Sequence, residues 1–219
     1  ITISIEPTIE FNNRSGMASS TRNKAIELWK AQLPEGDPQL LSKILFSYEN
    51  PPGTKNVAGS QDALGIVMPC LNYHYYSQDN YWPSEIKSIN DDSILDWLEN
   101  HIYLIPLDPR GKNYDVLAST NISENGTKNL ADAANKCWDA ILNKDLNAFG
   151  TSFLDSFHAQ IAMFPNMFDE SIKPIIHKYA SKCIGYKLSG AGGGGYLILI
   201  AEKPIENAIQ IKIRRKNLM

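Results

Sequence analysis

The stretch KLSGAGGGGYLILI, residues 187–200, places four consecutive glycines between an apolar lead-in and a run of leucine and isoleucine. Glycine costs roughly 0.5–1 kcal/mol of stability wherever alanine would serve, so Gly192–Gly195 need a structural reason. Two explanations are open: backbone without Cβ atoms crosses another segment closely, or successive amides form a nest for an anion. The run Tyr196–Ile200 predicts a strand directly after the glycines, which argues against a flexible joint.

The composition is that of an ordinary globular protein, since 43% of the 219 residues are apolar and 21% are charged. The net charge of −3 gives no electrostatic reason to expect a nucleic-acid partner. No apolar run approaches the roughly 20 residues of a membrane span, and the basic cluster at 212–217 is interpreted as a solvated tail. Cys70, Cys137 and Cys183 fit neither a disulfide framework nor a metal site, which favours a cytoplasmic location.

Hydrophobic periodicity predicts strands that alternate with paired helices. Strands are predicted at 1–11, 66–76, 84–89, 101–107, 183–188 and 196–203. Helices are predicted at 19–33, 37–48 and 91–100, and further helical stripes run over 130–141, 146–161 and 168–179. The pattern predicts an α+β fold, with helices on one face of a mostly antiparallel sheet. We place the domain boundary after residue 92, which gives domains 1–92 and 93–219.

The segment RSGMASSTRNKA, residues 14–25, leads through a glycine turn and two serines into a predicted helix start. Backbone N–H groups and the helix dipole make such a start a binding site for anions. Ser19 and Ser20 would add hydroxyl groups for a phosphate or a magnesium ion. The alternative is that one serine caps the helix, which is the commonest use of serine at this position.

The segment ENPPGTKNVAGSQDALG, residues 49–65, carries two acids that could divide the work of a reaction. Glu49 ends a predicted helix, and Asp62 is predicted in a glycine-bounded loop. One carboxylate would bind a metal ion and the other would lie near a substrate hydroxyl. The alternative is that both acids face solvent.

In this order and spacing, the three elements resemble the motifs of the GHMP kinases, the superfamily of galactokinase, homoserine kinase, mevalonate kinase and phosphomevalonate kinase. GMASSTR at 16–22 is similar to the second motif, roughly PxxxGLGSSAA, and KLSGAGGGG at 187–195 matches the third, roughly KxxGAGGGG. The stretch from residue 49 to 73 resembles the GGxQDQ region of fucokinase-like and heptose-kinase-like members. The resemblance covers almost the whole chain.

The resemblance implies ATP-dependent transfer of the γ-phosphoryl group to a hydroxyl of a small molecule, here a fucose-like or heptose-like sugar. It implies a two-lobed fold, in which a partial N-terminal lobe like a ribosomal-protein domain precedes a ferredoxin-like C-terminal lobe. We expect a sugar as the partner, with no nucleic acid or membrane bound, and we leave a homodimer open.

By the same resemblance, Asp62 would accept the proton of the substrate hydroxyl or orient that hydroxyl, and Ser20 and Glu49 would hold Mg²⁺. The glycine run would lie against the loop that binds the ATP phosphates. The residues implied in nucleotide binding are Gly16, Met17, Ala18, Ser19, Ser20, Gly190, Ala191, Gly192, Gly193 and Gly194.

The chain departs from the family pattern at several positions. Ala18 stands where glycine is usual, Thr21 and Arg22 replace small residues, and Ala63 replaces the glutamine after the aspartate. The family's first motif, near PGRxxLxGEHxDY, should precede the second, but only 15 residues lie before Gly16. We therefore expect an N-terminally truncated chain. The second functional hypothesis is a catalytically weak or inactive homologue that acts as a binding or regulatory module.

Overall fold

The computed structural model describes residues 17–30, 32–77, 80–111, 114–168 and 170–216. The chain forms two compact units: unit 1 includes 18–95 and the C-terminal segment from 212, and unit 2 includes 96–211. The division falls inside helix α4 (Asp92–His101), which is present where the sequence predicts a helix. The domains 1–92 and 93–219 stay a prediction. The predicted strand at 1–11 lies outside the described residues, as does Gly16.

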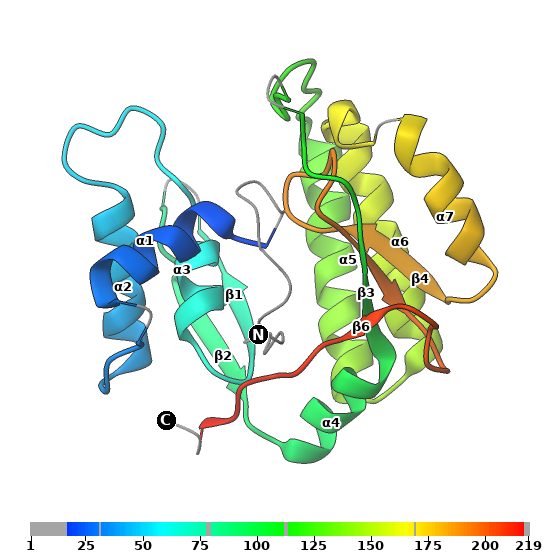
Figure 1. The fold of residues 1–219 in the computed structure, drawn as a ribbon, viewed down its shortest axis with the longest axis horizontal. Helices are drawn as coiled ribbons and strands as arrows, with labels where there is room; N and C mark the ends of the chain where they lie inside the picture. The colour runs from blue at the N-terminus through cyan, green and yellow to red at the C-terminus, as the bar shows by residue number, and fades with distance from the viewer. Residues whose placement is uncertain (1–16, 31, 78–79, 112–113, 169, 217–219) are drawn as a thin grey trace. The chain divides into compact units, whose positions relative to one another are not determined.

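The described residues of unit 1 form the helices α1 (Ser19–Trp29), α2 (Pro38–Glu49) and α3 (Ser60–Val67) (Figure 1). Helix α2 begins where the sequence predicts, because Asp37 caps it by accepting a 2.8 Å hydrogen bond from the backbone N–H of Gln39. The three helices share one small core. Its buried members are Ala25 from α1, Leu41 and Leu45 from α2, and Ala63 and Val67 from α3.

Two predictions for unit 1 are wrong. Segment 60–67 is a helix, although the sequence pattern predicts a loop and then a strand that starts at residue 66. Burial of Ala63, Leu64 and Val67 at helical spacing explains the helix. The strand begins only after Pro69, as β1 (Leu71–Tyr75), and pairs antiparallel with β2 (Glu85–Ile89).

Unit 2 contains a four-stranded antiparallel sheet in the order β4-β5-β3-β6. Its strands are β3 (Ile102–Pro106), β4 (Gly185–Leu188), β5 (Tyr196–Ile200) and β6 (Ile209–Gln210). The sequence predicts the first three. It misses β6, because two residues are too short for an alternating pattern to be recognised.

Helices α5 (Glu124–Leu142) and α6 (Leu146–Met163) are capped by the side chains of Ser123 and Asp145. Figure 1 shows them side by side along the sheet of unit 2, as predicted. The stripe at 168–179 is helical over a shorter span than predicted. Helix α7 (Lys173–Ala180) follows two 3₁₀ turns, which end at Ile172.

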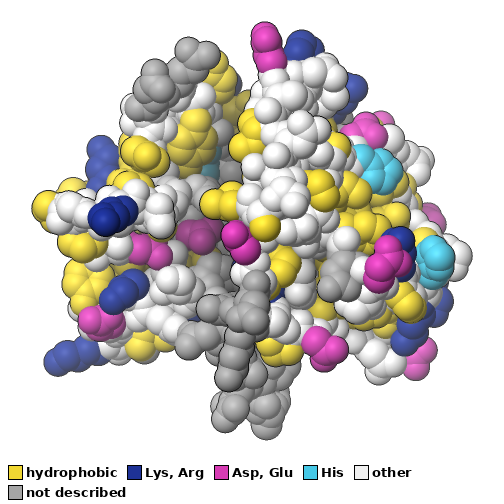
Figure 2. All heavy atoms as spheres, turned by 90° about the horizontal axis from the view of Figure 1, so that it is seen from above, with side chains coloured by type: hydrophobic (Ala, Val, Ile, Leu, Met, Phe, Trp, Pro, Cys, Tyr) yellow, Lys and Arg dark blue, Asp and Glu magenta, His cyan; other side chains and the backbone are white. Residues whose placement is uncertain are grey.

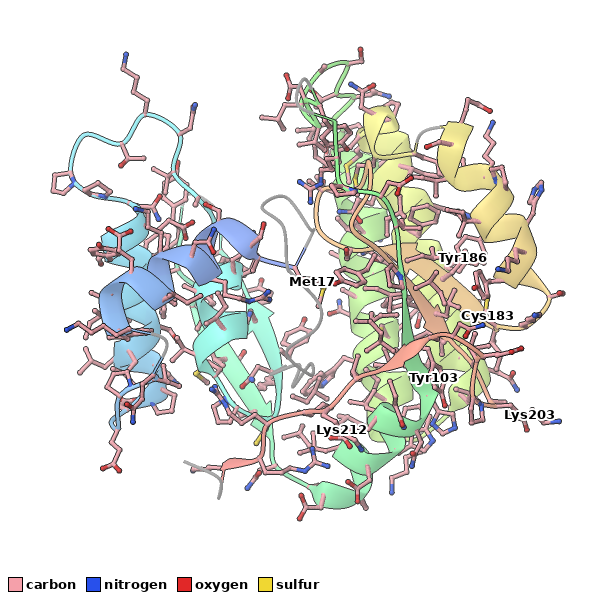
Figure 3. All side chains as sticks on the ribbon, viewed as in Figure 1. Met17, Tyr103, Cys183, Tyr186, Lys203 and Lys212 are labelled. Atoms are coloured by element: carbon pink, nitrogen blue, oxygen red, sulfur yellow. The ribbon has the colours of Figure 1, made fainter. Side chains whose placement is uncertain are left out.

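The core of unit 2 packs helices α6 and α7 against the sheet. Tyr103 on β3 is buried in it, and Tyr186 on β4 packs against it with its ring centroid 5.8 Å from that of Phe157 on α6 (Figure 3). Other buried members are Ile105, Ile172, Ile176, Tyr179, Leu188, Leu197 and Leu199. Strand β5, which directly follows the glycine run, is therefore held at the centre of a packed layer.

The surface mixes charges of both signs. On the face shown in Figure 2, acidic and basic side chains lie among each other, in keeping with the small net charge. Within the part of the chain that the structure describes, every helix is too short or too polar to cross a bilayer.

Candidate active site

The start of helix α1 has an unusual backbone conformation. Ala18 is the N-cap residue, with φ +51° and ψ +37°, and it offers no side chain that could cap the helix. Ser19 and Ser20 are the first two helical residues, so the alternative in which one of them is the N-cap is wrong. Ser19 is half-buried and Ser20 is exposed. An anion at this helix start would be favoured by the helix dipole.

The first turn of α1 is bonded to the end of α2. The Thr21 hydroxyl donates to both carboxylate oxygens of Glu49, at 2.8 Å each, and the Thr21 side chain is only 1% exposed. Hydrogen bonds to a charged group stabilise by about 1.5–3 kcal/mol. The sequence pattern identifies Thr21 only as a replacement for a small residue. The sequence signal for its role was that Thr21 lies four residues before Ala25, on the apolar face of the predicted helix.

A second set of contacts fixes the same pair of helices further along. Tyr48 on α2 donates from its hydroxyl to Glu27 on α1 at 2.7 Å, and Lys24 pairs with Glu27 at 2.9 Å. The hydrogen bond from Lys24, assisted by that from Tyr48, lowers the pKa of Glu27. These contacts are exposed and individually weak, and they join the same two helices, α1 and α2, as the bond between Thr21 and Glu49.

The loop between α2 and α3 is closed by the Asn50 side chain. Its Oδ1 accepts from the backbone N–H of Ala58 at 2.7 Å, and its Nδ2 donates to the carbonyl of Ala58 at 3.3 Å and to that of Phe46 at 2.9 Å. The start of α3 is therefore held near the end of α2. Asp62, half-buried, lies in the first turn of α3 and not in a loop as predicted.

The other end of α3 is held by the C-terminal segment. The Arg214 guanidinium donates to the carbonyls of Ile66 and Val67, the last residues of the helix, and the Cys70 N–H donates to the Arg214 carbonyl at 2.8 Å. A cation at a helix C-terminus complements the dipole. Arg215 pairs with Asp92 at 3.0 Å. The interpretation of 212–217 as a solvated tail is therefore wrong for these two arginines.

In unit 2, the glycine run adopts a backbone that other residues rarely adopt, with φ of +67°, +68° and +142° at Gly192, Gly193 and Gly194. A Cβ there would lie 2.6 Å from the Met167 carbonyl oxygen, 2.1 Å from the Tyr114 ring and 2.4 Å from the Asp108 carbonyl oxygen, respectively. The run is thus explained by close packing, the first of the two alternatives.

Hydrogen bonds of the run support the same conclusion. The Gly193 N–H donates to Met167 at 2.9 Å, the Gly195 N–H to Asp108 at 3.2 Å and the Gly192 N–H to Ser189 at 3.3 Å, in each case to the carbonyl. The Tyr114 hydroxyl donates to the Ala191 carbonyl at 2.6 Å. These three amides are engaged within the protein, so they do not form an anion nest in this conformation.

Lys187, the first residue of the third motif, points into unit 2. Its Nζ donates to the Ser156 hydroxyl on α6 at 2.6 Å, and burial lowers its pKa to about 8. Burial also raises the pKa of the Cys137 thiol on α5 to about 11, which disfavours the thiolate form. All three cysteines are free thiols.

No family model and no curated protein matches the chain. Solved structures do match it. A mevalonate kinase aligns with 97% of this chain and 68% of its own, at 16% identity and a TM-score of 0.60. A D-glycero-D-manno-heptose 1-phosphate kinase from Bacteroides thetaiotaomicron aligns with 94% of this chain and 74% of its own, at 11% identity and a TM-score of 0.51. The Methanococcus jannaschii mevalonate kinase aligns with 84% of this chain and 56% of its own, at 20% identity and a TM-score of 0.55.

The fold is that of the GHMP kinases. The resemblance seen in the sequence motifs is therefore confirmed at the level of the fold, and so is the predicted α+β class. Sequence identities this low establish no more than the fold.

The GHMP kinase fold implies a magnesium ion, and the donors in unit 1 suit one. Mg²⁺ in phosphoryl-transfer sites is bound by one or two carboxylates together with substrate phosphates, and not by an all-protein cage. Among the described residues, there is no group of three or more His, Cys, Asp or Glu side chains that could hold a metal by itself. Glu49 would supply one carboxylate, which the Thr21 hydroxyl holds, and Ser20 is the residue before Thr21.

Ser19, Ser20, Glu49 and Asp62 of the predicted site all belong to unit 1. The contacts of Thr21 and Asn50 bring the start of α1, Glu49 and the start of α3 with Asp62 into one region. The predicted nucleotide-binding residues Gly190–Gly194 belong to unit 2. Their binding role, like that of Met17–Ser20, stays a prediction.

Proposed function

We propose that this protein is an ATP-dependent kinase that transfers the γ-phosphoryl group to a hydroxyl of a sugar, of fucose-like or heptose-like structure. The observation that carries the proposal is the carboxylate of Glu49, the last residue of α2, which Thr21 in the first turn of α1 holds in place. Asp62 lies in the first turn of the neighbouring helix α3. The GHMP kinase fold supports a kinase. It does not select the acceptor, since both a heptose 1-phosphate kinase and mevalonate kinases match. The SQD segment at 60–62 favours the sugar.

In this mechanism the protein positions groups and neutralises charge, because phosphoryl transfer requires little covalent chemistry from the enzyme. Asp62 would accept the proton of the attacking hydroxyl or orient that hydroxyl. Backbone N–H groups at Ser19 and Ser20 would bind phosphate oxygens of ATP. Glu49 and the Ser20 hydroxyl would hold Mg²⁺, which neutralises the phosphate charge when it is bound.

The test is phosphorylation of a monosaccharide panel by the full-length protein with Mg²⁺ and ATP. Asp62→Asn should lower kcat by roughly 10²–10⁴-fold, the contribution typical of a general base, while calorimetry shows unchanged MgATP binding. Glu124→Gln is the matched control, because Glu124 is also an acid in the first turn of a helix. Wild-type protein that phosphorylates no sugar, or Asp62→Asn with wild-type kcat, would contradict the proposal.

Ala18 favours a second candidate function, that of an inactive homologue acting as a binding or regulatory module. The backbone of Ala18 has φ +51° and lies in the segment proposed to bind phosphate. Its Cβ, which a glycine would lack, could crowd the ligand there. Absence of ATP binding at millimolar concentration, measured by calorimetry on the full-length protein, would favour this candidate over the kinase.

A further inference from the structure

Helix α3, which carries Asp62, ends in a way that interrupts one column of its hydrogen bonds. In a continuous helix each N–H donates to the carbonyl four residues earlier, so the column through Asp62 and Ile66 would continue to the N–H of Cys70. Pro69 disfavours a further helical turn, and Cys70 has φ +67°, in the left-handed region. The helix therefore ends at Val67, and the Ile66 carbonyl and the Cys70 N–H need other partners.

Arg214, from the C-terminal segment, supplies both of these partners. Its guanidinium donates to the Ile66 carbonyl at 3.4 Å and also to the Val67 carbonyl. Its own backbone carbonyl accepts from the Cys70 N–H at 2.8 Å. The Cys70 thiol is fixed in turn, because it donates to the Asn90 side chain at 2.9 Å. Arg214 thus takes the place of one missing step in the column and joins the end of α3 to the start of β1.

The conformation of this junction depends on tertiary contacts. A left-handed backbone is unfavourable for a residue with a side chain, and it persists where the surrounding structure fixes it. Cys70 is such a residue, and Arg214 and Asn90 are the partners that hold it. The positive charge of Arg214 also complements the dipole at the C-terminal end of α3. The junction is therefore held where a local preference would not place it.

The Arg214 contacts lie directly along the helix from Asp62. Asp62 and Ile66 are four residues apart, so they lie on the same face of α3, roughly 6 Å apart along its axis. Helix α3 has eight residues, and isolated helices shorter than about 12 residues are marginal in water. Burial of Ala63 and Val67 selects the face that turns inward, but apolar contacts are not directional. The directional bonds of Arg214 therefore fix the position of α3 along its own axis.

We infer that Arg214 is a positioning residue for the proposed phosphoryl transfer: by joining the end of α3 to the start of β1, it fixes where α3 places the Asp62 carboxylate. The inference rests on the proposed function in taking Asp62 as the group that acts on the substrate hydroxyl. It goes further by giving the C-terminal segment a part in the reaction, through the backbone of α3 and without contact to the substrate.

The first test measures kcat of the full-length protein with MgATP and the sugar that it phosphorylates best. Arg214→Met keeps most of the side-chain length and removes the guanidinium. It should lower kcat about 10–100-fold, because a displacement of about 1 Å can cost 10²-fold in rate. Calorimetry should show a Kd for MgATP within about twofold of the wild type. Arg214→Lys, which keeps a cation that can donate to one carbonyl, should recover most of the loss in kcat.

The matched control is Arg215→Met. Arg215 is the next residue of the same segment, and its guanidinium bonds to Asp92 at 3.0 Å and to the Ile213 carbonyl at 2.7 Å. Its kcat should stay within about twofold of the wild type. Wild-type kcat in Arg214→Met, or an equal loss in Arg214→Met and Arg215→Met, would overturn the inference.

A double variant separates positioning from a general structural role. If Arg214 acts through Asp62, adding Arg214→Met to Asp62→Asn should lower kcat by less than about twofold more, since the group to be positioned is already lost. Losses that multiply would mean that the two residues act independently, and they would overturn the inference.

Hydrogen exchange of the backbone amides gives a readout without turnover. Arg214→Met should speed exchange in the last turn of α3 at least about tenfold and leave α2 unchanged, because the lost bonds act on α3 alone. Arg215→Met should leave both helices unchanged. Faster exchange throughout unit 1 in Arg214→Met would show a general loss of stability and would overturn the inference.

The outcomes separate the two proposals. A wild type that phosphorylates a sugar, together with wild-type kcat in Arg214→Met, would support the kinase and overturn the inference. A wild type that phosphorylates no sugar would overturn the kinase. Faster exchange confined to α3 in Arg214→Met would then still support Arg214 as the residue that fixes this helix.

Discussion

The Thr21 hydroxyl donates to both carboxylate oxygens of Glu49, at 2.8 Å each, across 28 residues of sequence. A carboxylate held in this way keeps one orientation, as ligands supported by neighbouring groups do in metal sites. Removing the hydroxyl should therefore weaken a metal ion bound by Glu49. It should also destabilise the contact between α1 and α2.

We expect Thr21→Val to lower the stability of unit 1 by about 1–2 kcal/mol and to weaken Mn²⁺ or Mg²⁺ binding, measured by calorimetry in the presence of a non-hydrolysable ATP analogue. Thr21→Ser should restore both properties because it keeps the hydroxyl. Thr127→Val is the control, since Thr127 bonds only to backbone carbonyls of its own helix region. Metal binding unchanged in Thr21→Val would contradict the role of this pair.

Ala18 and Lys30 bound the same helix with nearly equal left-handed backbones, at φ +51° and +52°. A non-glycine residue in this region costs about 1–2 kcal/mol, offset in part by the larger unfolded-state entropy of glycine. Both Ala18→Gly and Lys30→Gly should raise stability slightly, by up to about 1 kcal/mol. Calorimetry should show tighter ATP binding for Ala18→Gly alone. An equal change in both variants would show that the effect is one of helix stability only.

Gly193 is the position in the glycine run where a side chain should be tolerated least. Gly193→Ala would place a Cβ 2.1 Å from the Tyr114 ring at φ +68°, and we expect a loss of more than about 2 kcal/mol in chemical denaturation. The control is Gly65→Ala, which meets no atom within 4 Å and should stabilise α3 by roughly 0.5–1 kcal/mol.

A double variant separates the two causes of this loss. Adding Tyr114→Ala to Gly193→Ala should recover the part due to the ring and leave the part due to the backbone conformation. Gly193→Ala with wild-type stability would refute the close-packing explanation of the run.

His74 should make unit 1 less stable in acid. Burial lowers its pKa below the usual value of about 6.5, and its Nε2 is buried without a partner among the described residues. Below about pH 6.5 the unfolded chain binds a proton that the folded protein resists, so stability falls as pH falls towards the folded-state pKa. Thermal unfolding between about pH 7.5 and 5.5 should show this slope. His74→Phe should reduce it, and His177→Phe, at an exposed position, should not.

The titration midpoint of Lys187 should lie below that of exposed lysines. Its pKa of about 8 is far below the usual value of about 10.4, so stability should rise with pH between about 8 and 10, where the unfolded chain holds the extra proton. NMR of ε-¹³C-labelled lysine should show one resonance with a midpoint near 8, which is absent in Lys187→Met. A Lys187 resonance with a midpoint near that of exposed lysines would refute its burial.

Much of the fold was predictable from local patterns. The helices at 37–48, 91–100, 130–141 and 146–161 and the strands β3, β4 and β5 of unit 2 were found because their burial follows the helical or strand period over several residues. Helix α3 was mistaken because eight residues are too few to distinguish a short helix from a loop followed by a buried strand. Its burial depends on α2, which is a tertiary contact.

By itself, the sequence determined the fold class, the family resemblance and the positions of Ser20, Glu49, Asp62 and the glycine run, because these depend on residue type and order. Tertiary structure decided what surrounds them. Thr21 meets Glu49 and Arg214 meets Val67 across 28 and 147 residues, and no local pattern encodes such pairs. Tyr114 and Met167 likewise explain the glycines of KLSGAGGGGYLILI, since only packing brings those segments together.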